Sequence, residues 1–208
     1  MSRRTVSCSE KHTPLSPHKN RIRRNWMKKI NKNKDIITIS HGLLDVAMLL
    51  GWRGRIQICD LDPGVRETTT YLAGLDGYTS DYPELNILPP GTDIYSTVEA
   101  YCSKYGIKHL RAVDVDLACK LDRAWLILAP VLGELSRNNY KGKVFLTFQN
   151  GRDQFGKNAT GSRINWFRQQ VSKCAKLVRH DLYRSVRINQ NAERSMGSAM
   201  CFVEFQMS

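Results

Sequence analysis

Strand-like and helix-like patterns alternate along the chain from Asp35 onward, and this alternation constrains the fold more than any other feature. Short β-branched and apolar runs predict strands, and apolar residues at helical spacing predict helices between them. The expected strands cover 35–40, 55–59, 85–88, 109–115, 143–148, 185–189 and 200–206, and the expected helices cover 43–50, 64–75, 94–105, 121–135 and 162–178. Strands joined by crossover helices form a mainly parallel sheet with helices on both faces.

The last two expected strands are joined by a polar turn around Gly197 that is too short to contain a crossover helix. Antiparallel strands need only a short connection, so these two should form a hairpin. We therefore expect residues 35–208 to form a three-layer Rossmann-like α/β sandwich, with a mostly parallel sheet and a C-terminal antiparallel hairpin.

The first 34 residues differ from the rest in charge, since they hold eleven of the 32 Lys and Arg residues and a single acid, Glu10. Pro14, Pro17 and many polar residues predict a flexible basic arm, with a short helix around 24–30. Such an arm attracts polyanions, because binding releases counterions condensed on phosphates. A solvated tail without a fixed partner and an anionic membrane surface remain alternatives. The residues expected to contact RNA or DNA are Arg21, Arg23, Arg24, Lys28 and Lys29.

The six cysteines form no C-x-x-C pair, and most lie within apolar runs. This spacing argues against structural zinc and against a disulfide framework, and it favours a reducing compartment. No stretch approaches the roughly 20 apolar residues of a membrane span. We therefore expect a cytoplasmic protein that is neither secreted nor transmembrane and binds no metal.

Small or acidic residues stand at or just after the carboxyl ends of the first four expected strands, at Ser40, Asp60, Asp93 and Asp114. Ligands of open parallel sheets bind at the carboxyl ends of the strands, where these residues should meet. Asp60 could accept two hydrogen bonds from a ribose diol, and Asp93 could accept one from an adenine amino group. Both could instead cap the helices that follow them. Asp114 would lie near the reacting centre. We expect Asp114 and Asp116 to point to opposite faces of the strand, so that at most one of them faces the pocket.

The order and spacing of these residues resemble class I S-adenosylmethionine-dependent methyltransferases over roughly Asp35 to Gln206. The resemblance implies S-adenosyl-L-methionine as cofactor, with the loop Ser40-His41-Gly42 beside its methionine part. It implies Asp60 as the ribose acid, Asp93 as the adenine acid and Asp114 as the catalytic position on the fourth strand. The sequence departs from the family in having one glycine in the first loop. It also lacks the Asn/Asp-Pro-Pro-aromatic motif, so methylation of adenine N6 is not supported.

Two functions fit this pattern. The first is methyl transfer from S-adenosylmethionine to a nucleic acid, with Arg152 as a further phosphate contact unless it pairs with Asp122 or Asp153. The second is a catalytically inactive methyltransferase-fold protein, cellular or viral, that binds nucleic acid. His41 is expected to be a structural histidine more than a general base.

Overall fold

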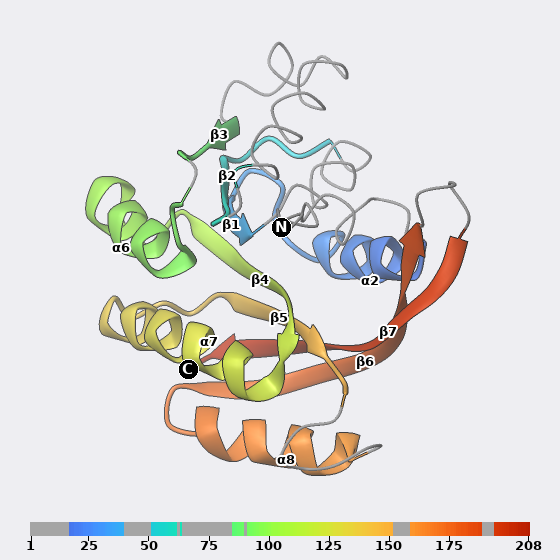
Figure 1. Cartoon of the computed structure of the whole chain (residues 1–208). Coiled ribbons are helices and arrows are strands. Elements are labelled where there is room, and N and C mark those ends of the chain that lie inside the picture. Colours follow the sequence, from blue (N-terminus) through green and yellow to red (C-terminus); the bar gives the residue numbers. More distant parts are fainter. Residues whose placement is uncertain are drawn as a thin grey trace, which may run out of the picture.

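The computed structural model describes residues 17–39, 51–61, 63, 85–89, 91–151, 159–188 and 194–208 (Figure 1). The expected helices at 43–50 and 64–75 lie outside these residues. The described elements are α2 (Pro17–Met27), β1 (Asp35–Ile39), β2 (Ile56–Cys59), β3 (Leu85–Ile87), α6 (Ile94–Tyr105), β4 (Leu110–Lys120), α7 (Leu121–Arg137), β5 (Lys143–Gln149), α8 (Thr160–Val171), β6 (Ala175–Ile188) and β7 (Arg194–Met207).

Within the described residues, seven strands form one sheet in the order β3-β2-β1-β4-β5-β7-β6. The strands from β3 to β5 pair in parallel. β7 pairs antiparallel with both β5 and β6, so it lies between them. The expected α/β class, the mostly parallel sheet and the antiparallel C-terminal pair are confirmed.

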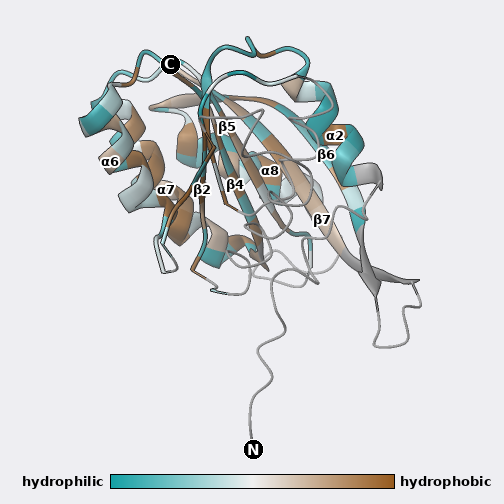
Figure 2. Cartoon of the chain, turned by 90° about the horizontal axis from the view of Figure 1, so that it is seen from above, coloured by the Kyte–Doolittle hydropathy of each residue, from teal (hydrophilic) through white to brown (hydrophobic). Residues whose placement is uncertain are grey.

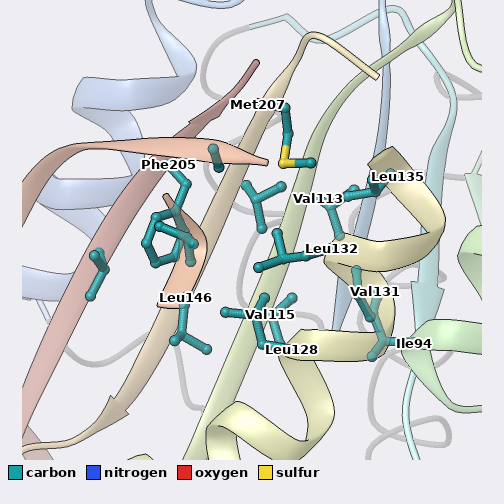
Figure 3. Close-up of a cluster of buried hydrophobic side chains, with 14 of the residues drawn as sticks. Ile94, Val113, Val115, Leu128, Val131, Leu132, Leu135, Leu146, Phe205 and Met207 are labelled. Atoms are coloured by element: carbon teal, nitrogen blue, oxygen red, sulfur yellow. The ribbon is translucent and has the colours of Figure 1, made fainter. Parts of the chain in front are cut away.

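Helices α6, α7 and α8 pack on one face of the sheet through an apolar core. Figure 3 shows the part of this core to which α6, α7, β4, β5 and β7 contribute. Helix α7 turns a stripe of buried side chains at helical spacing toward β4, β5 and β7: Ala124, Leu128, Val131, Leu132 and Leu135. Fully burying one such leucine contributes about 1.5–3 kcal/mol. This layer fixes α6 and α7 beside the carboxyl edge of the parallel strands.

Helix α2 packs on the opposite face, beside β6 and β7 (Figures 1 and 2). The Trp26 ring stacks on Phe145 of β5 with 3.9 Å between ring centroids, and Ile22, Met27 and Ile30 are buried in the same cluster. The expectation that residues 17–34 belong to a flexible arm is therefore wrong, because this apolar stripe folds back onto the sheet. Residues 1–16 lie outside the described residues.

Three other boundaries differ from expectation. The helix predicted over 162–178 ends at Val171, and the apolar residues beyond it begin strand β6. Gly197 lies within β7 and not in the turn. β4 continues to Lys120, so Asp114 lies inside the strand and not at its end.

Candidate functional site at the carboxyl edge of the sheet

A cavity of about 370 Å³ opens at the carboxyl ends of the parallel strands. Asp60 follows β2, and Asp93 precedes α6. Both line this cavity, so the structure brings the two carboxylates together as the strand pattern predicted. The remaining lining residues are mostly apolar and come from β1, β2, β4, the helices α6 and α7, and the segments after β2 and before α6: Ile39, Cys59, Leu61, Thr92, Ile94, Tyr95, Leu117, Leu126, Ile127 and Pro130.

Asp93 is also the N-cap of helix α6. Its Oδ1 accepts a hydrogen bond from the Ser96 backbone N–H at 2.9 Å, and its Oδ2 accepts one from the Ser96 hydroxyl at 2.8 Å. Burial would raise the pKa of Asp93, but the hydrogen bonds from Ser96 outweigh it and lower the pKa below its ordinary value. An ionised carboxylate has about four acceptor sites. Asp93 can therefore cap the helix and still accept a hydrogen bond from a ligand.

The segment after β3 holds the backbone of Asp60 in place through a hydrogen bond. The Asp60 carbonyl accepts a hydrogen bond from the Gly91 N–H at 3.2 Å. Gly91 has a φ of 82°, a left-handed conformation that favours glycine. This turn places Thr92 and Asp93 against the end of β2.

The apolar walls of the cavity were not predicted from the sequence. Helix α7 contributes Leu126, Ile127 and Pro130, and Leu126 is 72% exposed although it lines the cavity. Cys59 lies at the base, where burial raises the pKa of its thiol to about 12, so the thiol stays neutral. A cavity with a few polar groups among apolar walls is typical of small-molecule and cofactor sites.

Asp114 does not line this cavity. It lies on the α2 face of β4 and is almost fully buried together with Asp116. The expectation that Asp114 and Asp116 point to opposite faces is wrong, because residues two apart on a strand share a face and Arg23 contacts both. Burial raises the pKa of Asp114, since the opposing effect of the Arg23 guanidinium is smaller. The expected place of Asp114 at a strand end beside the reacting centre is therefore corrected.

Two cations of α2 form ion pairs with these carboxylates. The Arg23 Nη2 lies 2.5 Å from Asp116 Oδ2 and 3.5 Å from Asp114 Oδ2, and the Lys19 ammonium also binds Asp116. Arg23 is 3% exposed, so its expected role as a nucleic-acid contact is corrected to a buried ion pair. Arg21, Arg24, Lys28 and Lys29, in contrast, are all exposed.

The segment after β5 is fixed by a buried arginine. Arg163 of α8 donates to the Asn150 side-chain oxygen at 2.9 Å and also to the Gly151 carbonyl. Asn150 in turn donates to Thr160 at 2.9 Å. Sequence reasoning missed Arg163, whose burial depends on distant partners. Ser40, His41, Gly42 and Arg152 lie outside the described residues.

Across the part of the chain that the structure describes, no cluster of three metal-binding side chains is present. Among the same residues, no helix is long and apolar enough to cross a membrane.

Comparison with known proteins gives a result at the level of structure only. No protein-family model matches the sequence, and no curated protein matches it. An rRNA methylase from Streptococcus thermophilus is similar in structure, with a TM-score of 0.53 at 12% identity over 89% of this chain and 94% of that chain. A Pyrococcus horikoshii protein assigned as an RNA methyltransferase gives 0.55 at 12% identity over 90% and 80%.

A third similar structure contains a nucleoside. The branched-chain polyamine synthase from Thermus thermophilus, in complex with N4-aminopropylspermidine and 5′-methylthioadenosine, gives a TM-score of 0.56 at 13% identity over 92% of this chain and 57% of that chain. Together with the strand order, these likenesses show the fold. The chain has the class I fold of S-adenosylmethionine-dependent methyltransferases, as the sequence resemblance implied.

Proposed function

We propose that this protein is an S-adenosylmethionine-dependent methyltransferase that acts on nucleic acid. The observation that carries the proposal is the convergence of Asp60 and Asp93 on one mostly apolar cavity at the carboxyl edge of the parallel sheet. Carboxylates accept the hydrogen bonds that a ribose diol and an exocyclic amino group donate. Apolar walls suit a purine ring, so the residues present fit an adenosine group.

In this proposal Asp60 binds the ribose. Asp93 accepts a hydrogen bond from the adenine amino group while it also caps α6. Ile94, Leu117 and Ile127 line the walls around the base and exclude water. Ser40, His41 and Gly42 follow β1 and hold the methionine part. The cofactor supplies an electrophilic methyl group when bound. The contribution of the protein is to hold the acceptor in line with that group, which is catalysis by positioning.

Nucleic acid is proposed as the acceptor because of the outer surface of α2 and the turn that follows it. Arg21, Arg24, Lys28 and Lys29 are exposed there, and the chain carries a net charge of +13. Similar structures include proteins that are named as RNA methylases. Arg152, which follows β5, is proposed as a further phosphate contact. Asp114 is not assigned a contact with the acceptor, because Arg23 and Thr38 engage its carboxylate.

Titration calorimetry with S-adenosylhomocysteine tests the cofactor site. Asp60→Ala should weaken binding by about tenfold or more, since a hydrogen bond to a charged group contributes about 1.5–3 kcal/mol. Asp122→Ala is the matched control, because Asp122 is an exposed acid of α7 that does not line the cavity. Absence of binding by the folded wild-type protein would refute the cofactor assignment. Binding of cofactor without methyl transfer to RNA or DNA would favour the inactive scaffold.

The salt dependence of RNA and DNA binding tests the acceptor class. Replacing Arg21, Arg24, Lys28 and Lys29 by Gln should reduce the slope of log K against log salt by about 3, since each phosphate contact contributes about 0.7–0.9. The control replaces four exposed cations outside α2 and its turn, one in α6 and three at or just before the amino ends of β4 and β5: Lys104, Lys108, Arg111 and Lys141. Equal slopes for both sets would show that α2 is not the nucleic-acid surface.

A further inference from the structure

Four buried charges join helix α2 to strand β4. Arg23 spans the carboxylates of Asp114 and Asp116 on the same face of β4, and Lys19 binds Asp116. The cluster therefore holds two cations and two carboxylates. Carboxylates this close together repel each other, and in a low-dielectric interior that repulsion is stronger than in water. The two cations of α2 favour the ionised form of Asp114, against the effects of its burial and of the neighbouring Asp116 carboxylate.

A chain of contacts leads from this cluster to the cavity. The Thr38 hydroxyl of β1 lies 3.0 Å from Asp114 Oδ2, the same oxygen that Arg23 approaches, and 3.1 Å from the Ile39 carbonyl. The Cys59 thiol of β2 points to the Thr38 carbonyl at 3.7 Å. Ile39 and Cys59 both line the cavity. The buried ion cluster is thus one side chain away from the cavity wall.

We propose that Arg23 is a positioning residue for the cofactor cavity, acting through Asp114 and Thr38 on the carboxyl end of β1. The guanidinium holds the Asp114 carboxylate in place, and Asp114 in turn orients Thr38, where β1 leads into the residues proposed to hold the methionine part. This inference rests on the proposed cofactor function.

Removal of the Arg23 guanidinium changes the charge balance of the cluster. Without Arg23, the cluster holds one cation and two carboxylates, so burial and repulsion favour proton uptake by one acid or its displacement. A protonated or displaced Asp114 no longer accepts the Thr38 hydrogen bond in the same geometry. A shift of about 1 Å at a reacting centre can cost about a hundredfold in rate, and a hydrogen bond lost from the site lowers affinity by up to about tenfold.

The test compares affinities for S-adenosylhomocysteine in the full chain. Arg23→Met should weaken binding by about tenfold, the loss expected when one hydrogen bond to the cofactor is no longer made. Met27→Ala is the matched control, since Met27 is fully buried in α2 but takes no part in the ion cluster. It should lower the melting temperature and change the affinity by less than about twofold. Equal losses in both variants, or no loss in Arg23→Met, would overturn the proposal.

A charge-balanced double variant separates charge from packing. Arg23→Met combined with Asp114→Asn leaves Lys19 opposite Asp116, and the introduced amide can still accept from Thr38 through its side-chain oxygen. The affinity should return to within about threefold of wild type, whereas a loss caused by missing packing would remain. If Arg23→Met does not fold, Thr38→Val removes the same link without changing charge, and an unchanged affinity would then contradict the proposal.

Amide hydrogen exchange gives a measurement that needs no cofactor. Arg23→Met should speed exchange along β1, residues 35–39, more than Met27→Ala does. If wild-type protein binds no S-adenosylhomocysteine, the proposed function fails. The exchange comparison still decides whether Arg23 holds the end of β1.

Discussion

The two faces of the sheet are joined to their helices by different forces. Helices α6, α7 and α8 are held by a continuous apolar core, whereas α2 combines an apolar stripe with a buried cluster of four charges. Apolar burial stabilises without direction. A buried ion pair adds little net stability, because desolvation offsets the attraction, but it is costly to break. The difference indicates that the apolar face supplies stability, and that the charged face fixes the orientation of α2 against β4.

The largest effect is expected on the charged face. Asp116→Asn leaves Lys19 and Arg23 opposite a single carboxylate and should lower the free energy of unfolding by about 3–5 kcal/mol. Chemical denaturation measures this loss. Adding Lys19→Met restores the charge balance and should recover much of it. A double variant no more stable than the single one would show that the charges of the cluster are not coupled.

A comparable but packing-based loss is expected on the apolar face. Leu128→Ala should cost about 2–5 kcal/mol through lost burial and the cavity left behind. The same denaturation measurement applies. No second substitution that removes a charge should restore the lost free energy of unfolding. If a change of charge did restore stability, the apolar and the charged faces of the sheet would not differ in the way proposed.

A smaller, pH-dependent effect is expected at the cap of α6. Asp93→Ala should cost about 1 kcal/mol at pH 7, because the Ser96 N–H loses its partner. The folded pKa of Asp93 lies below its unfolded value. Its contribution is therefore present above about pH 4 and is lost as the pH falls through the folded pKa. Thermal melts across this range should show the gap between wild type and variant closing in acid. A gap that widens in acid would contradict the assignment.

The smallest effect on stability is expected at the cavity mouth. Leu126→Ala should change the free energy of unfolding by less than about 0.5 kcal/mol, because the side chain is 72% exposed. The same variant should weaken S-adenosylhomocysteine binding if the cavity wall contacts the cofactor. Calorimetry on the variant checks this, and an unchanged affinity would place the ligand elsewhere in the cavity.

Local signals were sufficient for much of the fold. The helix over Ile94–Tyr105 was predicted to the residue, because Asp93 caps its start and Gly106 ends it. The start of β6 was missed, since the apolar residues around Ala175 fit either a helix or a strand until β7 supplies a pairing partner. The burial of α2 was missed because the basic charge of residues 1–34 favoured a solvated arm over a helix whose apolar stripe packs on the sheet.

The candidate site could be predicted only in part. Strand-end positions brought Asp60 and Asp93 together, because parallel strands share one carboxyl edge. The buried role of Arg23 could not be predicted, since its partner Asp116 on β4 lies 93 residues further along the chain. The apolar wall from α7 likewise depends on how that helix sits above the sheet.

The docking of α2 has a consequence for how the chain folds as it is synthesised. The helix precedes β1, yet it packs against Phe145 of β5, Tyr183 of β6 and Phe202 of β7. A ribosome must therefore make most of the polypeptide before this segment meets its partners. Until then its tryptophan and its cations face solvent on the nascent chain. Contacts between residues so distant in sequence form slowly, so the docking of α2 should be among the last steps in maturation of the domain.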